Sequence, residues 1–256
     1  LGFVSFLALA VVADSLPSWG MDEFSKEILV PEEISAKFAL AKQVRREGYL
    51  PVAWEIYTFI AKNNNETQEN RAIAYLKLGF ISVIASLQSG NKGQEALYYK
   101  QALDLAETEK TKVKARGKLL PLKYPDVLGI SSELQKDCEY IMSSQEAKPN
   151  NKGYAHLRYG SLMQIMAEKT DNSLSKRIYR KNAMASFQSI IDTPNNISHN
   201  TRGQALFCRA LLAEQMEDFQ SAQKLSQLLI EKYHNKDSQY KDTPSCVIAD
   251  VCFMKA

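Results

Sequence analysis

The amino-acid sequence predicts an all-α protein, a solenoid of about five antiparallel helix hairpins. Glycine and proline are scarce, at 11 and 8 of 256 residues, and alternating runs of β-branched and polar residues are nearly absent, so helices are favoured over sheets. The composition, 45% apolar and 24% charged, can supply a hydrophobic core. Paired amphipathic segments also recur along the chain, which indicates stacked repeats.

The first hairpin is predicted on either side of Gly48. An amphipathic helix precedes this glycine, and a second helix begins near Pro51. Glycine permits the turn, and proline suits the first turn of a helix because its missing N–H would have no partner there. The two apolar stripes are Ile34, Phe38, Ala41 and Val44, followed by Ala53, Ile56, Tyr57 and Ile60.

Three further hairpins follow, and the small residue near the start of each second helix gives the period. Ala53, Ala96, Ala183 and Ala222 are separated by 43, 87 and 39 positions. Because the middle gap is close to twice the first, a fifth unit is expected inside it. Apolar residues that mark the first helices of these hairpins are Leu76 and Phe80, Tyr159 and Leu162, and Leu206 and Ala210.

The fifth unit is expected to be irregular and to occupy residues 111–150. Its second helix is predicted over 131–146, where apolar residues recur at helical spacing. Its first helix is predicted to be broken over 118–126, because this stretch contains two prolines and proline disrupts a helix interior. This irregularity is the predicted place for a bend in the array.

Several motifs resemble those of tetratricopeptide-repeat proteins. Leu40–Ala41, Gly79 and Tyr159–Gly160 match the family's pair of a large and a small residue in the first helix, where the small residue lets the partner helix approach. Residues 98–105 look like the family's second helix. The units of about 40 residues exceed the usual 34, as in the long-repeat type of bacterial envelope proteins. The resemblance covers roughly residues 32–235.

The resemblance implies a right-handed α-solenoid, here spanning residues 32–256, that binds a protein or peptide partner. The family's partners lie in the concave groove lined by first helices. From their positions on those helices, the expected groove residues are Lys37, Tyr75, Lys77, His156 and Arg209. The leading hypothesis is therefore a protein-interaction scaffold, and the alternative is the helical part of a glycan- or lipid-binding envelope protein.

The chain begins with an uncharged apolar run over residues 1–13, as long as the apolar region of a signal peptide and too short to span a bilayer. A signal peptide would make the protein periplasmic or secreted. The alternative is a buried first helix in a cytoplasmic protein. Residues 14–31 would then be an extension before the repeats. The absence of a starting methionine leads us to expect a few residues upstream. The last segment, 246–256, looks like the first helix of a further unit, and either it closes the array or the chain continues beyond it.

No enzyme, cofactor or metal site is expected. The three histidines are far apart in sequence, no catalytic motif is present, and no CxxC spacing indicates zinc. Cys138 and Cys208 are expected to be buried thiols; pairing of Cys246 with Cys252 is open, although one helix would hold them apart. The net charge of +3 is too small to favour nucleic acid.

Two basic runs stand out against this mild net charge. One covers residues 110–123 and the other Lys176–Lys181. Each is interpreted as a solvated helix face, with an acidic partner or an anionic membrane surface as the sharper alternative.

Overall fold

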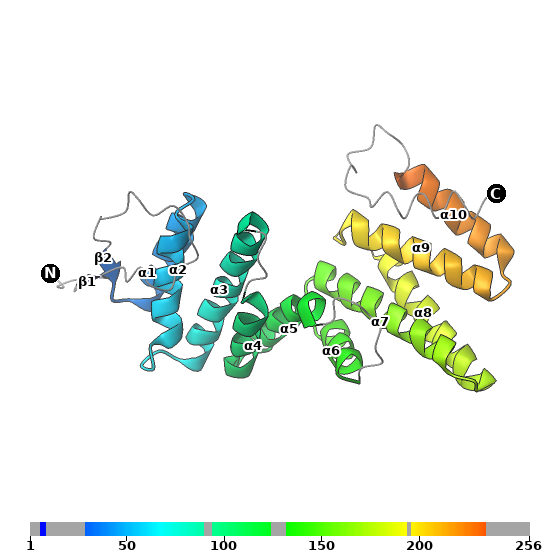
Figure 1. Ribbon diagram of the computed structural model, residues 1–256, viewed down its shortest axis with the longest axis horizontal. Coiled ribbons are helices and arrows are strands. Elements are labelled where there is room, and N and C mark those ends of the chain that lie inside the picture. The colour runs from blue at the N-terminus through cyan, green and yellow to red at the C-terminus, as the bar shows by residue number, and fades with distance from the viewer. Residues whose placement is uncertain (1–5, 9–28, 90–93, 124–131, 194–195, 234–256) are drawn as a thin grey trace. The chain divides into compact units, whose positions relative to one another are not determined.

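The computed structural model describes residues 6–8, 29–89, 94–123, 132–193 and 196–233, and within them the chain is helical apart from one short antiparallel pairing (Figure 1). The all-α prediction is confirmed. The elements in chain order are β1 (Phe6–Ala8), β2 (Leu29–Pro31), α1 (Ile34–Arg46), α2 (Leu50–Lys62), α3 (Gln68–Ser89), α4 (Glu95–Leu105), α5 (Glu109–Lys123), α6 (Ser132–Ser143), α7 (Pro149–Lys169), α8 (Ser173–Asp192), α9 (His199–Gln215) and α10 (Phe219–Tyr233).

The chain divides into two compact units, which we call unit 1 (Leu1–Leu119) and unit 2 (Leu120–Ala256). In unit 1, α1 packs on α2, α2 on α3, and α3 on α4. In unit 2, α6 packs on α7, α7 on α8, α8 on α9, and α9 on α10. The boundary between the units falls inside α5, within the segment predicted to be irregular.

Residues 6–8 at the start of the chain pair with residues 29–31. The pairing is antiparallel, with Leu7 opposite Val30. A helix over these three residues, the alternative to a signal peptide, is therefore not formed. The rest of the predicted signal peptide lies outside the described residues, as do Cys246 and Cys252.

The first hairpin forms at the expected place. Gly48 has φ 95°, a left-handed backbone conformation that glycine adopts without a steric penalty. The Tyr49 N–H donates to the Val44 carbonyl across the turn, at 2.9 Å, and Pro51 lies in the first turn of α2. Both predicted stripes supply the core here, because Ala41, Ala53, Ile56, Tyr57 and Ile60 are buried.

The irregular unit differs from its prediction. A break of the first helix was predicted over 118–126. At Pro121 the helix is not broken, and α5 continues through this proline to Lys123. Pro121 lies close to the end of α5 and is exposed, so it removes a single backbone bond near a terminus. Leu119 and Leu120 just before it are buried, and their packing holds the last turn. The second predicted helix forms as α6.

Two glycines bring pairs of helices into close contact. A Cβ added at Gly79 in α3 would lie 2.5 Å from Cε1 of Tyr99 in α4. A Cβ added at Gly160 in α7 would lie 2.5 Å from Cε1 of Phe187 in α8. These separations are shorter than any ordinary carbon–carbon contact. The close approach expected at Gly79 and Gly160 is therefore present in both units.

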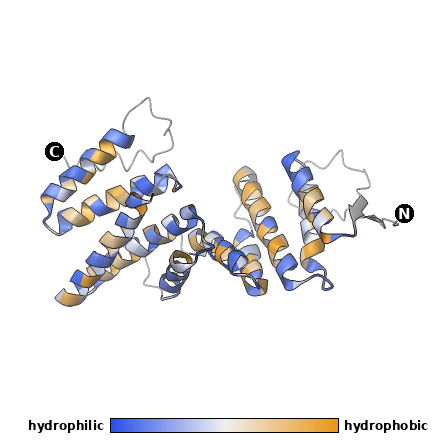
Figure 2. Ribbon diagram, turned by 180° about the vertical axis from the view of Figure 1, so that it is seen from behind, coloured by the Kyte–Doolittle hydropathy of each residue, from blue (hydrophilic) through white to orange (hydrophobic). Residues whose placement is uncertain are grey.

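The long helix α3 is apolar on more than one side. Over Gln68–Leu87 it is long and apolar enough to meet a composition criterion for a membrane span. It also packs between α2 and α4 and buries Ala74, Leu78 and Ile81 in the core of unit 1. Figure 2 shows the hydrophobic colouring along this helix. A core position accounts for part of that apolar character, since 39% of this window is buried.

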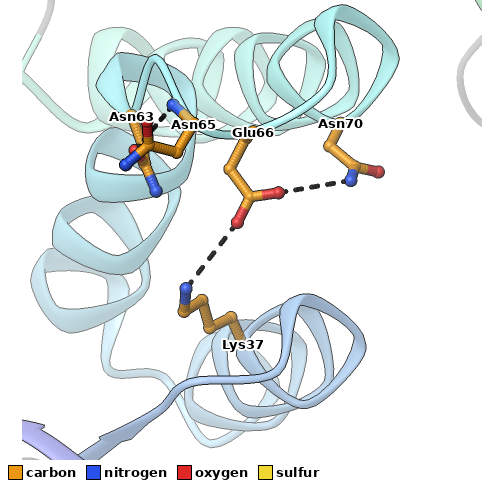
Figure 3. A network of polar contacts seen from close by, with 5 residues as sticks. All are labelled: Lys37, Asn63, Asn65, Glu66 and Asn70. Atoms are coloured by element: carbon orange, nitrogen blue, oxygen red, sulfur yellow. Dashed lines mark hydrogen bonds and ion pairs between the residues drawn. The ribbon is translucent and has the colours of Figure 1, made fainter.

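Polar side chains connect the starts of successive first helices. In unit 1 the Lys37 ammonium on α1 pairs with the Glu66 carboxylate just before α3, at 3.7 Å (Figure 3). The Glu69 carboxylate on α3 accepts hydrogen bonds from the backbone N–H groups of Glu107 and Thr108 just before α5. In unit 2 the Asn150 amide oxygen on α7 accepts from the Ser198 N–H before α9, at 2.7 Å.

Glu69 gives the first testable prediction. Although burial raises the pKa of its carboxyl group, hydrogen bonds from Thr111, Thr108 and Glu107 lower it below the ordinary value of 4.5 overall. A depressed folded-state pKa contributes stability above the unfolded-state pKa, and this contribution disappears as the pH falls through the folded-state value. We expect Glu69→Gln to reduce the free energy of unfolding at pH 7 by about 1 kcal/mol, because solvent screens part of the interaction of this partly exposed carboxylate.

The measurement is denaturant unfolding of both proteins, followed by circular dichroism between pH 7 and pH 3. The difference between wild type and Glu69→Gln should shrink as the pH falls below 4.5. Glu168→Gln, at an exposed position of α7, is the matched control and should change stability by less than about 0.5 kcal/mol. A constant difference at every pH would contradict the role of the carboxylate.

Candidate functional site

Three cations in unit 1 act electrostatically on Lys77 of α3: Lys42 and Arg45 on α1, and Lys114 on α5. We call these four residues the basic cluster. Burial lowers the pKa of the Lys77 ammonium, and the positive charges of Lys114, Arg45 and Lys42 lower it further. Like charges at short range repel each other, so an arriving anionic group would relieve part of this repulsion. The three helices that contribute, α1, α3 and α5, are each the first helix of a predicted hairpin.

Exposed apolar side chains extend from the basic cluster along α3. Phe80 is 38% exposed and Leu87 is 81% exposed, and their spacing from Lys77 places all three on one side of the helix. The Arg45 guanidinium lies over the Phe80 ring, 5.2 Å from its centroid. Such a cation–π contact holds the guanidinium beside the aromatic ring. The surface thus combines positive charge with accessible apolar area.

An open hollow of about 700 Å³ lies along α1 and includes Lys42. Its lining contains one aromatic ring, Phe38, and is otherwise small, polar or charged. The lining residues are Ser35, Phe38, Ala39, Lys42, Gln43, Arg46 and Glu47. The hollow therefore widens the accessible surface next to the basic cluster, and two of its side chains are cations.

Of the predicted groove residues in unit 1, Lys77 lies in the basic cluster. Lys37 is 8% exposed and lies over the Phe59 ring, 5.1 Å from its centroid, besides pairing with Glu66. Tyr75 stacks on Tyr98 of α4, with ring centroids 6.3 Å apart. Lys37 and Tyr75 thus contribute to packing between helices, whereas Lys77 is placed beside other cations.

The two predicted groove residues in unit 2 are half-buried. His156 on α7 has a pKa lowered by burial and by the positive charge of Lys152, so its imidazole is neutral at pH 7. The structure gives its buried Nδ1 atom no hydrogen bond among the described residues. The same holds for the Nε atom of Arg209 on α9.

The thiols of Cys138 and Cys208 both have raised pKa values. Burial raises the pKa of the Cys138 thiol to about 12 and that of Cys208 to about 11, so both are protonated at neutral pH. Cys138 is buried as expected, while Cys208 is intermediate. Within the described residues, no three His, Cys, Asp or Glu side chains gather closely enough to hold a metal ion.

Compared with known proteins, the chain matches no family model, no curated protein and no solved structure.

Sequence reasoning found Lys77 and the basic run that contains Lys114, but it missed Lys42 and Arg45. A signal for the two missed residues exists in the periodicity. Each lies one position after a buried residue of the α1 stripe, Ala41 or Val44, and therefore at the edge of that stripe. Their meeting with Lys77 depends on how α1 and α3 are placed in unit 1, which the periodicity of one helix does not specify.

Proposed function

We propose that this protein is an interaction scaffold, a right-handed α-solenoid of the tetratricopeptide type that binds a peptide or protein segment on the face formed by its first helices. The observation that carries the proposal is the basic cluster, to which α1, α3 and α5 each contribute. Charged groups at the rim of an interface steer the approach of an oppositely charged partner and select it. The accessible Phe80 and Leu87 add the apolar contact that affinity requires.

The polar connections between successive first helices support the solenoid. Lys37 with Glu66, Glu69 with Thr108, and Asn150 with Ser198 join the start of one first helix to the approach of the next. In unit 2, α7 also packs directly on α9. Stacked repeats are stabilised by such nearest-neighbour contacts, and their first helices line a continuous surface.

The lining of the hollow along α1 favours a protein partner over the glycan- or lipid-binding alternative. Small-molecule sites are mostly enclosed and lined by apolar and aromatic side chains. This hollow is open, has Phe38 as its one aromatic ring and contains two cations, Lys42 and Arg46. The apolar composition of residues 1–13 supports export, so we place the scaffold in the periplasm or outside the cell. The proposal assigns the scaffold no catalytic step.

A peptide-display selection on the full chain tests the proposed function. We expect the enriched peptides to carry aspartate or glutamate next to an apolar residue. Their affinity, measured by fluorescence anisotropy, should fall on the order of tenfold or more in the double variant Lys42→Glu, Lys77→Glu, because each charge reversal places repulsion where attraction was. Arg45 is left unchanged because its guanidinium lies over Phe80.

The matched control reverses the same amount of charge elsewhere. Arg177→Glu with Lys181→Glu on α8 should leave peptide affinity within about twofold, because neither residue belongs to the basic cluster. Enrichment of peptides without acidic residues, or equal affinity for wild type and the Lys42, Lys77 variant, would show that the basic cluster is not the binding surface.

A further inference from the structure

Two aliphatic side chains protrude from the first turns of α8. Leu174 is 67% exposed and Ile178 is 49% exposed, whereas aliphatic residues of this size are usually buried. They are four positions apart and therefore lie one above the other on the same side of the helix. The buried side of α8, represented by Ala183, Phe187 and Ile190, faces the core of unit 2. Leu174 and Ile178 contribute nothing to that core.

Cations surround these two aliphatic residues. Arg177 and Lys181 are exposed and lie on the same outward side, three positions after Leu174 and Ile178 respectively. We call Leu174, Arg177, Ile178 and Lys181 the α8 ridge. Half-buried Arg180 lies beside it, whereas half-buried Lys176 leaves the helix on the side of Ala183 and Phe187, and the only carboxylate of α8 is its last residue, Asp192. Including the end of α7 and the turn, residues 168–181 carry five cations against two carboxylates.

We propose that the α8 ridge docks the protein onto an anionic lipid bilayer, with Leu174 and Ile178 entering the headgroup region and Arg177 and Lys181 facing lipid phosphates. Aliphatic residues bordered by Lys and Arg are the pattern of surface-bound helices. The long side chains of the cations let their charges stay at phosphate level while the ridge is lowered toward the acyl chains. This docking is independent of the partner-binding surface in unit 1.

The form of the ridge favours a bilayer over other occupants. A protein interface usually needs about 800 Å² from each partner, far more than two side chains of one helix supply, and its centre is enriched in aromatic residues. A bilayer requires no shape complementarity. A second copy of the chain would bring Arg177 and Lys181 toward their own counterparts, and like charges repel each other.

Vesicle flotation with the full chain tests this proposal. We expect binding to vesicles of phosphatidylcholine with 30% phosphatidylglycerol and none to pure phosphatidylcholine vesicles. Binding should weaken as salt rises to 0.5 M, because salt screens the attraction between the cations and the lipid phosphates. Arg177→Gln with Lys181→Gln should lower the partition coefficient about 20-fold, since each surface cation contributes roughly fivefold. Leu174→Ser with Ile178→Ser should lower it on the order of tenfold.

Two matched controls and one spectroscopic signal complete the design. Leu97→Ser, at a 52% exposed position of α4, and Lys224→Gln with Lys232→Gln, at exposed positions of α10, should both bind vesicles within about twofold of wild type. Ile178→Trp adds a tryptophan to the ridge. Its fluorescence emission should shift to shorter wavelengths on anionic vesicles, because insertion moves the indole ring into a less polar environment. Circular dichroism checks that each variant is folded.

Several results would overturn the proposal: no preference for anionic vesicles, equal losses in ridge and control variants, or full binding after Leu174→Ser with Ile178→Ser. A chain that ignores vesicles but loses an acidic protein partner in the Arg177, Lys181 variant would identify the ridge as a protein-binding surface instead.

Discussion

Replacing Phe187 by alanine should destabilise the folded protein by about 3–5 kcal/mol. The Phe187 side chain is completely buried in unit 2, and its ring lies against Gly160 of α7, where no side chain is present to move into the vacated space. A cavity of this kind costs both the lost apolar burial and the contacts of the surrounding atoms. Denaturant unfolding followed by circular dichroism measures the loss.

Phe219→Ala is the matched control for this cavity. Phe219 begins α10 and is 65% exposed, so the same change of residue should alter the free energy of unfolding by less than about 0.5 kcal/mol. If the two variants lose similar amounts of stability, packing of Phe187 between α7 and α8 does not stabilise the protein as its burial indicates.

The parts of the fold that could be predicted from sequence are those set by single residues acting on the backbone next to them. Gly48 and Pro51 act on the backbone at their own positions, so the turn between α1 and α2 and both flanking helices could be predicted from sequence. Pro121 shows the limit of the same reasoning. Its disruption of α5 depends on whether neighbouring residues pack, and the burial of Leu119 and Leu120 outweighs the missing backbone bond.

The candidate surface was less predictable because it depends on contacts between helices. Tyr75 and Lys77 were both assigned to one groove, yet two positions on a helix differ by about 200°, so the two side chains leave α3 on different sides. Tyr75 accordingly stacks on Tyr98, while Lys77 meets the cations of α1 and α5. The exposure of Leu174 and Ile178 likewise depends on contacts between helices. Their spacing also suits a core stripe, so only the packing of α8 in unit 2 decides that they are exposed.

Gly79→Val should destabilise the protein by about 3 kcal/mol, although glycine is a poor residue for the interior of a helix. A Cβ at this position would lie 2.5 Å from Cε1, 2.8 Å from Cδ1 and 2.9 Å from Cζ of Tyr99. The Tyr99 ring is 2% exposed, so it has no free space to enter, and α3 and α4 would have to separate. The gain in helix propensity, well under 1 kcal/mol, is too small to offset this overlap.

A double-mutant cycle with Tyr99→Ala isolates that overlap. Tyr99→Ala alone should cost about 3–5 kcal/mol because it leaves a cavity beside Gly79. In this background the valine side chain fills part of the cavity, so Gly79→Val should raise the free energy of unfolding instead of lowering it. Ala96→Val, at an exposed position of α4, is the control for introducing valine and should cost about 0.5 kcal/mol. The same loss from Gly79→Val in both backgrounds would mean that the glycine is required by the backbone of α3 and not by the approach of α4.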